Sequence, residues 1–189
     1  MFFAQFGNMV SLSLTRMKTL PHSFFNRKTL RVAQDLIGKY LVREIDGEII
    51  REKIIETEAY VGPHDLACHS SRGRTKRCEP MFGKAGTIYV YFTYGMHWML
   101  NIVTEEKGNP CAVLIRGTEK VSGPARLTKK LKIDKKLNGE MLGKKSGLWI
   151  EFDPKIENSK LKILRTPRIG VAYAGSGWAE KPYRFILKN

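Results

Sequence analysis

The stretch of this sequence that decides the fold spans residues 54–104. It opens with Ile-Ile-Glu-Thr-Glu-Ala-Tyr at residues 54–60 and continues to Thr-Ile-Tyr-Val-Tyr-Phe-Thr-Tyr-Gly-Met at residues 87–96. Each segment predicts a β-strand, the first ending in carboxylates and the second bearing tyrosines two residues apart. Because side chains alternate between the faces of a strand, Glu56 and Glu58 are expected to project to one side.

The second strand, predicted at residues 87–93, has two different faces. Alternation puts Tyr89 and Tyr91 on one face and apolar side chains on the other. The pair Tyr94-Gly95 predicts a reversal, after which residues 98–104 return antiparallel. Tyr94 is therefore expected at or near the tip of a hairpin.

Further elements are predicted on both sides of this stretch. Residues 29–37 have apolar side chains at helical spacing and are followed by Gly38, which favours a helix end. Residues 39–45 and 48–58 predict a second hairpin around Asp46-Gly47. The remaining predictions are strands at residues 111–116, 148–152, 161–164 and 184–187, and a basic helix over residues 123–137 that begins at Gly123-Pro124.

The chain is short and strongly basic. Its 189 residues fit one domain, and a hydrophobic content of 42% is enough for a core. Lys and Arg total 33 against 18 Asp and Glu, and the net charge of +15 predicts an anionic partner, most often nucleic acid and sometimes a membrane. Arg72, Arg74 and Arg77 form a cluster that predicts phosphate contacts. The lysines of residues 129–145 fit phosphate binding and a solvated surface equally well.

Three cysteines without a Cys-x-x-Cys pair argue against a disulfide framework and against a cysteine-based zinc site. A reducing cytosolic compartment is the simplest interpretation. Cys68 and His69 are adjacent, so on an extended segment they point to opposite faces and do not form a catalytic dyad. Cys68 is expected to be a buried thiol.

The N-terminus predicts neither a membrane span nor a signal peptide. Residues 1–19 are expected to be a flexible extension, with Met9 and Met17 as alternative start sites to Met1. The folded domain is expected over residues 20–189.

Residues 54–104 also contain candidate catalytic and binding residues. A glutamate at a strand end can act as a general base if it faces a pocket, although most glutamates in a lysine-rich chain pair with surface lysines. Glu58 is favoured because Tyr60 follows on the same strand face. Taken alone, Tyr91 would be a sheet residue and His69 a hydrogen-bonded structural residue. Tyr89 is expected to be part of the sheet only. With the positive charge, a carboxylate near aromatic rings suits chemistry on a nucleobase removed from its stack.

Several motifs occur in a fixed order along nearly the whole chain, roughly residues 20–187. They are residues 54–63, His69, Met81-Phe82, Gly-Thr-Ile-Tyr-Val-Tyr at residues 86–91, Tyr94-Gly95-Met96, Asn101, Val-Leu-Ile-Arg at residues 113–116, and residues 123–127, 148–151, 167–171 and 182–185. In order and spacing they resemble the alkyladenine (3-methyladenine) DNA glycosylase family.

The resemblance implies excision of alkylated purines from duplex DNA by nucleotide flipping. Glu58 matches the general base, which deprotonates a water that attacks C1′ of the flipped nucleotide. Arg116 matches the arginine that helps to position this water. Attack on an oxocarbenium-like centre follows the logic of glycoside hydrolysis.

The resemblance also implies a pocket for the flipped base. Tyr60 and Tyr91 match the aromatic residues that sandwich the base, and His69 matches a third wall that can hydrogen-bond. Asn101 matches the residue that disfavours guanine, whose exocyclic amine would clash.

The fold implied by the resemblance is α+β: a single compact domain with a curved antiparallel β-sheet core, peripheral helices and a protruding DNA-intercalating β-hairpin. Tyr94, Gly95 and Met96 would form the hairpin tip that enters the minor groove. The implied partner is double-stranded DNA containing alkylated bases, bound by a monomer without cofactor or metal. The implied location is the cytoplasm, at the nucleoid in a bacterium.

Several alternatives stay open from the sequence. Ala125 stands where the family often has glycine, and it would need a negative φ. The expected substrate is 3-methyladenine, with 7-methylguanine, hypoxanthine and ethenoadenine as further candidates. A noncatalytic RNA- or ribosome-binding module would show the same charge and tyrosines. A lyase-type glycosylase would need a lysine nucleophile, which no motif position beside Glu58 supplies.

Overall fold

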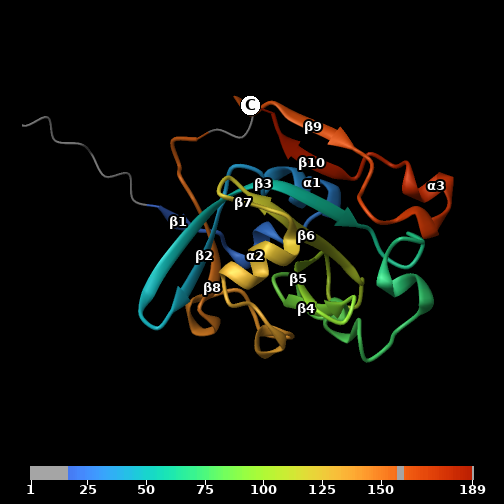
Figure 1. Ribbon diagram of the computed structural model, residues 1–189, viewed down its shortest axis with the longest axis horizontal. Helices are drawn as coiled ribbons and strands as arrows, with labels where there is room; N and C mark the ends of the chain where they lie inside the picture. The colour runs from blue at the N-terminus through green and yellow to red at the C-terminus, as the bar shows by residue number, and fades with distance from the viewer. Residues whose placement is uncertain (1–16, 157–159, 189) are drawn as a thin grey trace, which may run out of the picture.

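The computed structural model describes residues 17–156 and 160–188. Within them the chain forms one curled, entirely antiparallel sheet in the order β1-β8-β2-β3-β6-β5-β4, with β10 joining β3 to β9 and β7 joining β6 (Figure 1). The strands are β1 (Lys18–Thr19), β2 (Tyr40–Ile45), β3 (Glu48–Tyr60), β4 (Ile88–Thr93), β5 (His97–Thr104), β6 (Cys111–Thr118), β7 (Val121–Ser122), β8 (Leu148–Phe152), β9 (Ile163–Thr166) and β10 (Arg184–Leu187).

The helices are few and short. Helix α1 packs on β3 and β6, and α2 packs on β5, β6 and β7. The fold is therefore α+β with a curved antiparallel sheet, as predicted. The α-helices are α1 (Thr29–Asp35), α2 (Pro124–Lys130) and α3 (Ser176–Ala179), and the 3₁₀ turns are η1 (His22–Phe24), η2 (His69–Arg72), η3 (Glu79–Phe82), η4 (Lys135–Leu137), η5 (Lys144–Ser146) and η7 (Ala172–Ala174).

The alternation of β4 separates two apolar clusters. Ile88 and Val90 face the main core, which also contains residues of α1, β5 and β6. Tyr89 faces a smaller cluster on the other side of the sheet, against which the ring of Tyr91 packs. The predicted faces of this strand are confirmed, and the smaller cluster forms the base of the candidate site.

The pairing of β3 with β6 is irregular where the acidic residues lie. The register shifts between Ile54 and Glu56 and again between Glu56 and Thr57, as in a β-bulge. Such irregularities re-aim side chains and are frequent beside active sites. Thr57 then points to α1, where its hydroxyl donates to the carbonyl of Ala33 at 2.8 Å.

The helix predicted over residues 123–137 is shorter than expected. It ends at Lys130 because Lys132 adopts a positive φ of 46°, and Asp134 then caps the separate turn η4 by accepting from the backbone N–H of Lys136. The positive φ near its start belongs to Gly123, at 94°, and Ala125 lies inside α2. Alanine therefore fits at position 125 without left-handed strain.

Two other boundaries moved. The strand predicted at residues 161–164 is β9 at Ile163–Thr166. Among the described residues the first paired strand is β1, whose Lys18 lies opposite Phe152. The predicted flexible extension otherwise lies outside the described residues. In the part of the chain that the structure describes, no helix is long and apolar enough to cross a membrane.

Candidate active site

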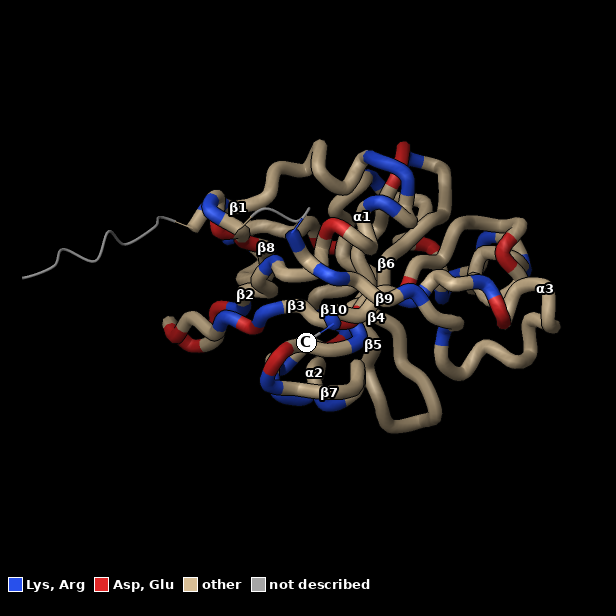
Figure 2. The backbone as a smooth tube through the Cα atoms, turned by 90° about the horizontal axis from the view of Figure 1, so that it is seen from above, with Lys and Arg blue, Asp and Glu red and all other residues tan. Residues whose placement is uncertain are grey.

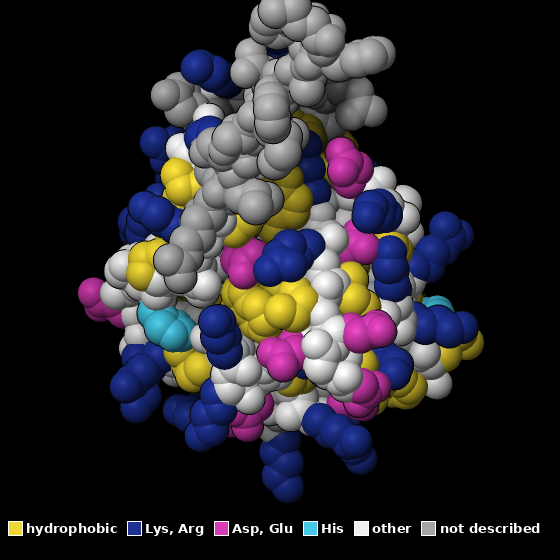
Figure 3. Space-filling model, turned by 90° about the vertical axis from the view of Figure 1, so that its left-hand side faces the viewer, with side chains coloured by type: hydrophobic (Ala, Val, Ile, Leu, Met, Phe, Trp, Pro, Cys, Tyr) yellow, Lys and Arg dark blue, Asp and Glu magenta, His cyan; other side chains and the backbone are white. Residues whose placement is uncertain are grey.

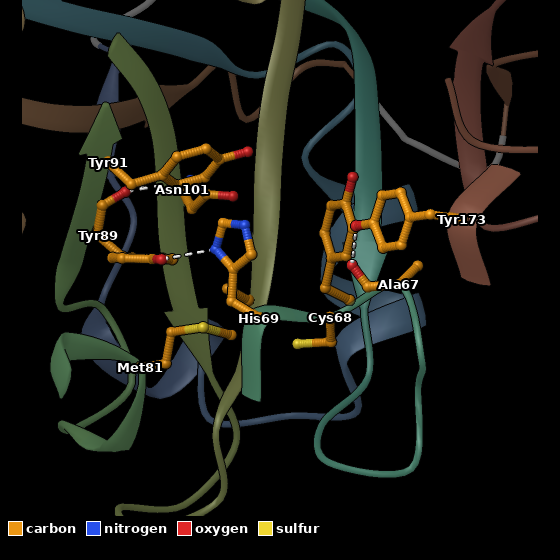
Figure 4. A pocket seen from close by; sticks show the side chains of 10 residues that line it. Ala67, Cys68, His69, Met81, Tyr89, Tyr91, Asn101 and Tyr173 are labelled. Atoms are coloured by element: carbon orange, nitrogen blue, oxygen red, sulfur yellow. Dashed lines mark hydrogen bonds between the residues drawn. The ribbon is translucent and has the colours of Figure 1, made fainter. Parts of the chain in front are cut away.

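A narrow cavity of about 30 Å³ lies on the face of the sheet where Tyr89 and Tyr91 project (Figure 4). Side chains from β3, β4, β5, β6, η3, η7 and the start of η2 converge on it. All four residues predicted to hold a base are in its wall. The lining residues are Tyr60, Ala67, Cys68, His69, Met81, Tyr89, Tyr91, Asn101, Ala112 and Tyr173.

The aromatic side chains on one wall are interlocked. The imidazole of His69 lies edge-on to the ring of Tyr91, with centroids 4.5 Å apart, and the rings of Tyr89 and Tyr91 are 5.4 Å apart. Nδ1 of His69 is 2.8 Å from the hydroxyl of Tyr89. The rings of His69, Tyr89 and Tyr91 therefore pack directly against one another on this wall.

His69 is held neutral in this wall. Burial, reinforced by the positive charges of Arg77 and Arg72, lowers the pKa of its imidazole to about 4. Burial also raises the pKa of the Tyr89 hydroxyl. At neutral pH the His69–Tyr89 contact thus joins two uncharged groups, and the imidazole offers one donor and one acceptor.

Asn101 is fixed at the inner end of the cavity. Its side-chain Nδ2 donates to the backbone carbonyls of Tyr89 at 3.2 Å and Met99 at 3.3 Å, as the dashed line to Tyr89 in Figure 4 indicates. Since both N–H groups are engaged, the buried amide cannot turn aside without losing two hydrogen bonds. It is a rigid part of the wall.

Glu58 lies immediately behind this wall and is fully buried. Its Oε2 accepts from the hydroxyl of Tyr60 at 2.9 Å, and its Oε1 accepts from the backbone N–H of Ile169 at 2.8 Å. Nη1 of Arg116 is 3.3 Å from the same Oε1. Burial raises the pKa of Glu58, while Arg116, the Ile169 amide and Tyr60 oppose that rise. A carboxylate balanced in this way is suited to accept a proton.

The guanidinium of Arg116 connects Glu58 to its neighbour on the strand. Nε of Arg116 donates to Oε1 of Glu56 at 3.0 Å, and the same oxygen accepts from Nε of Arg184 at 2.6 Å. Glu56 and Glu58 thus reach the same side of β3, as their spacing predicts. Glu56 orients Arg116, and of the two carboxylates it is Glu58 that is hydrogen-bonded to a residue of the cavity wall, Tyr60.

The hairpin of β4 and β5 ends in an exposed apolar tip. Tyr94 and Gly95 both have positive φ values, 53° and 66°, which matches a tight hairpin turn. The side chain of Tyr94 is 79% exposed and that of Met96 is 66% exposed. Residues 85–104 contain no Lys, Arg, Asp or Glu, so β4 and β5 are tan in Figure 2.

The predicted phosphate contacts separate into two kinds. Arg72 and Arg77 line an open cleft of about 400 Å³ that shares His69 and Tyr173 with the cavity. Arg77 also lies over the ring of Tyr91, at 5.2 Å. Arg74 instead forms two hydrogen bonds with Glu79.

The positive charge is not confined to this region. On the face shown in Figure 3, toward the β2–β3 hairpin of Figure 1, Lys and Arg are spread widely and Asp and Glu lie among them. Net charge alone therefore does not locate a binding face.

Two aromatic residues of the pocket were missed or misread from the sequence. Tyr89 was interpreted as a plain sheet residue, although alternation had put it on the face of Tyr91. Tyr173 comes from η7, where no local pattern distinguishes it, and its hydroxyl donates to the carbonyl of Ala67 at 2.9 Å. Cys68 is a buried free thiol, as expected. Among the described residues, no three His, Cys, Asp or Glu side chains are arranged to hold a metal ion.

Comparison with known proteins gives a consistent result. The family model described as methylpurine-DNA glycosylase matches residues 23–122 and 118–189. A protein of Methanocella arvoryzae named "Putative 3-methyladenine DNA glycosylase" is 42% identical over 193 residues, covering 92% of this chain and 94% of its own. Proteins with the same name from Legionella pneumophila (strain Corby) and Carboxydothermus hydrogenoformans are each 45% identical, covering 92% and 90% of this chain and 96% and 95% of their own.

Proposed function

The chain belongs to the methylpurine-DNA glycosylase family, and we propose on that premise that it is a monofunctional glycosylase that hydrolyses the N-glycosidic bond of alkylated purines in duplex DNA. The observation that carries the proposal is the buried carboxylate of Glu58, held by two hydrogen-bond donors and an ion pair with Arg116 directly behind an aromatic cavity. A noncatalytic RNA-binding module has no use for a buried group that is costly to ionise.

The cavity receives the flipped base. Tyr60 and Tyr91 supply ring faces, and stacking on such faces contributes about 1–3 kcal/mol per base. Electron-poor, cationic purines are favoured further by cation–π attraction. The fixed amide of Asn101 blocks the exocyclic amine of guanine, and His69 offers a neutral hydrogen-bonding edge.

The reaction is a displacement by water. Glu58 takes a proton from a water positioned by Arg116, the water oxygen bonds to C1′, and the electron pair of the N-glycosidic bond leaves with the purine. An alkylated purine cation leaves as a neutral base and needs no proton donor. For this reason 3-methyladenine is the first expected substrate. 7-Methylguanine leaves equally well but carries the exocyclic amine that Asn101 disfavours, and hypoxanthine and ethenoadenine need protonation as they leave.

Water, rather than a lysine, is the nucleophile in this proposal. In the described part of the chain, neither the cavity wall nor the hydrogen-bonded shell of Glu58 includes a lysine. Lys53, the nearest in sequence, pairs with Glu119 at 3.7 Å. A lyase reaction would leave a borohydride-trappable adduct with DNA, and we expect none.

DNA is held by the hairpin tip and the cleft. The uncharged tip, Tyr94-Gly95-Met96, inserts in the minor groove, where an apolar wedge offsets unstacking. Arg72 and Arg77 contact phosphates through the open cleft, whereas Arg74 contributes less because Glu79 already occupies it. We propose that the protein acts as a monomer in the cytoplasm, at the nucleoid in a bacterial cell.

Base release from duplexes that each contain one defined lesion tests this function. Glu58→Gln is expected to abolish release while leaving DNA binding nearly intact. Glu119→Gln, on the surface, serves as the matched control and should retain wild-type release. Release by Glu58→Gln at the wild-type rate would refute the assignment of the base, and binding without release by the wild type would favour a noncatalytic module.

A further inference from the structure

The buried pair of Asp65 and Arg168 lies beside the site and has no part in the mechanism above. Its two side chains have no solvent exposure. The contact is bidentate: Nη1 of Arg168 donates to Oδ2 of Asp65 at 2.5 Å and Nη2 donates to Oδ1 at 2.8 Å. Breaking such a pair by removing one partner leaves an uncompensated charge in the interior.

The guanidinium of Arg168 supports the ring of Tyr60. Its central carbon is 4.8 Å from the Tyr60 ring centroid and 5.3 Å from that of Tyr183, while Nη1 also donates to the carbonyl of Ala59 at 2.9 Å. One face of the Tyr60 ring is thereby occupied, which leaves the other face for the cavity. The orientation of that ring depends on Arg168.

The residue after Arg168 acts on Glu58. Ile169 donates its backbone N–H to Oε1 of Glu58, so anchoring the guanidinium of Arg168 also fixes the direction of this amide. Asp65 holds the other side, since its oxygens accept from the backbone N–H groups of Val61 and Ala67. The loop that delivers His69 to the cavity is thus tied to the same pair.

One feature of the Asp65–Arg168 pair opposes stability. Nε of Arg168 is the buried side-chain polar atom that lacks a hydrogen-bond partner among residues 17–156 and 160–188. An unpaired buried donor opposes folding. Violations of this kind in an otherwise satisfied interior are expected where function sets the geometry.

We propose that Arg168, clamped by Asp65, is a positioning residue that fixes the stacking ring of Tyr60 and the Ile169 amide of the Glu58 shell as one unit. The inference rests on the proposed function and adds to it: the ring that stacks the base and one hydrogen bond to the general base are held by a single guanidinium. Arg168 does not touch the base or the water.

The test is the pH dependence of single-turnover release from methylated duplex DNA. Arg168→Lys keeps the charge but loses the fork and the flat stacking surface. Misplacement of catalytic groups at this scale lowers the rate by about a hundredfold. The acid limb of the pH–rate profile should also move to higher pH, because Glu58 loses the hydrogen bond from the Ile169 backbone N–H that favours its ionised form. The other groups facing Glu58 remain: Arg116 from β6, Glu56 and Tyr60 from β3, Tyr91 from β4, and Arg184 of β10 through Glu56.

Arg165→Lys is the matched control. Arg165 also stacks on an aromatic ring, that of Phe185 at 5.2 Å, and bonds to Gln34, but it lies outside the site. This variant should keep the wild-type rate and acid limb. Binding of a duplex with an abasic-site analogue should be unchanged in both variants.

The proposal is overturned if folded Arg168→Lys keeps the acid limb of the wild-type pH–rate profile. It is also overturned if the fall in the rate of this variant equals the fall in its fraction of folded protein. Should that variant not fold, two further measurements decide. Asp65→Asn is expected to shift the limb in the same direction by less, and the wild-type Ile169 amide should be protected from hydrogen exchange. An unshifted limb or rapid exchange would refute the inference. Absence of release by the wild type would instead refute the proposed function.

Discussion

The backbone N–H of Ile169 donates a 2.8 Å hydrogen bond to Oε1 of Glu58, although 111 positions separate the two residues in the chain. The carboxylate comes from β3, and its donor comes from the segment between β9 and α3. Pairing of β10 with β3, with Arg184 opposite Glu58, brings these parts together. The C-terminal part of the chain is therefore needed to complete the candidate general base.

The first prediction is that Glu58→Gln stabilises the protein at neutral pH. A folded-state pKa above the ordinary 4.5 means that stability falls as pH rises through that window, because the unfolded chain loses the proton first. Glutamine does not ionise, so this fall in stability is absent, and its side-chain carbonyl can still accept the hydrogen bond from the Ile169 N–H. We expect a rise in melting temperature of roughly 2–4 °C, or about 1 kcal/mol for a chain of this size.

Thermal unfolding of both proteins across pH checks this prediction. The difference should disappear at low pH, where the protonated carboxyl resembles the amide. A Glu58→Gln protein that melts below the wild type at neutral pH would show that the ionised carboxylate is a net stabilising partner of Arg116.

The second prediction concerns His69. Its pKa is lowered from 6.5 to about 4, so between these values the unfolded chain binds a proton that the folded protein does not. Stability should therefore fall as pH falls from 6.5 to 4, and His69→Gln should flatten that decline. Urea unfolding at several pH values measures the slope. An equal slope in His69→Gln and in the wild type would contradict the prediction.

The third prediction concerns the hairpin tip. Tyr94→Ala should lower single-turnover base release by at least about tenfold, since about 1.4 kcal/mol or more of unstacking is no longer offset. Affinity for undamaged duplex should change little because Tyr94 is uncharged. Leu164→Ala, at another exposed apolar position, provides the control. An equal loss of undamaged-DNA affinity and of release would make Tyr94 a mere surface contact.

The fourth prediction separates the arginines of the basic loop. Each of Arg72→Gln and Arg77→Gln should reduce the slope of log affinity against log salt concentration by about 1. Arg74→Gln should change the slope less, because Glu79 already neutralises that guanidinium. Fluorescence anisotropy with an undamaged duplex at several salt concentrations measures all three. Identical slopes would mean that phosphates are bound elsewhere on this widely basic surface.

Much of the sheet could be predicted because its signals are local. Alternation in residues 87–93 and the turn at Tyr94-Gly95 gave both strands of the β4–β5 hairpin nearly to the residue. The helix predicted over residues 123–137 was too long because the prediction followed charge and helix propensity. The left-handed turn at Lys132 and the capping of η4 by Asp134 break it into two elements.

The site was predictable where its parts are close in sequence or match the family motifs. Tyr173 and the Ile169 amide reach it only through the pairing of β10, a long-range contact that no spacing in the sequence encodes. Tyr89 was misread for another reason. Alternation gives its face, but the face becomes a pocket wall only because the loop bearing His69 folds over it.

The narrowness of the cavity has a consequence for the choice between free bases and bases attached to DNA. A space of about 30 Å³ holds a water or two, far less than a fused two-ring base. On the proposed function, a base enters only by parting Tyr91 from His69, and a nucleotide of a bound duplex offsets that cost through its other DNA contacts. A free purine has no such contacts, so we expect free purines to inhibit base release only weakly.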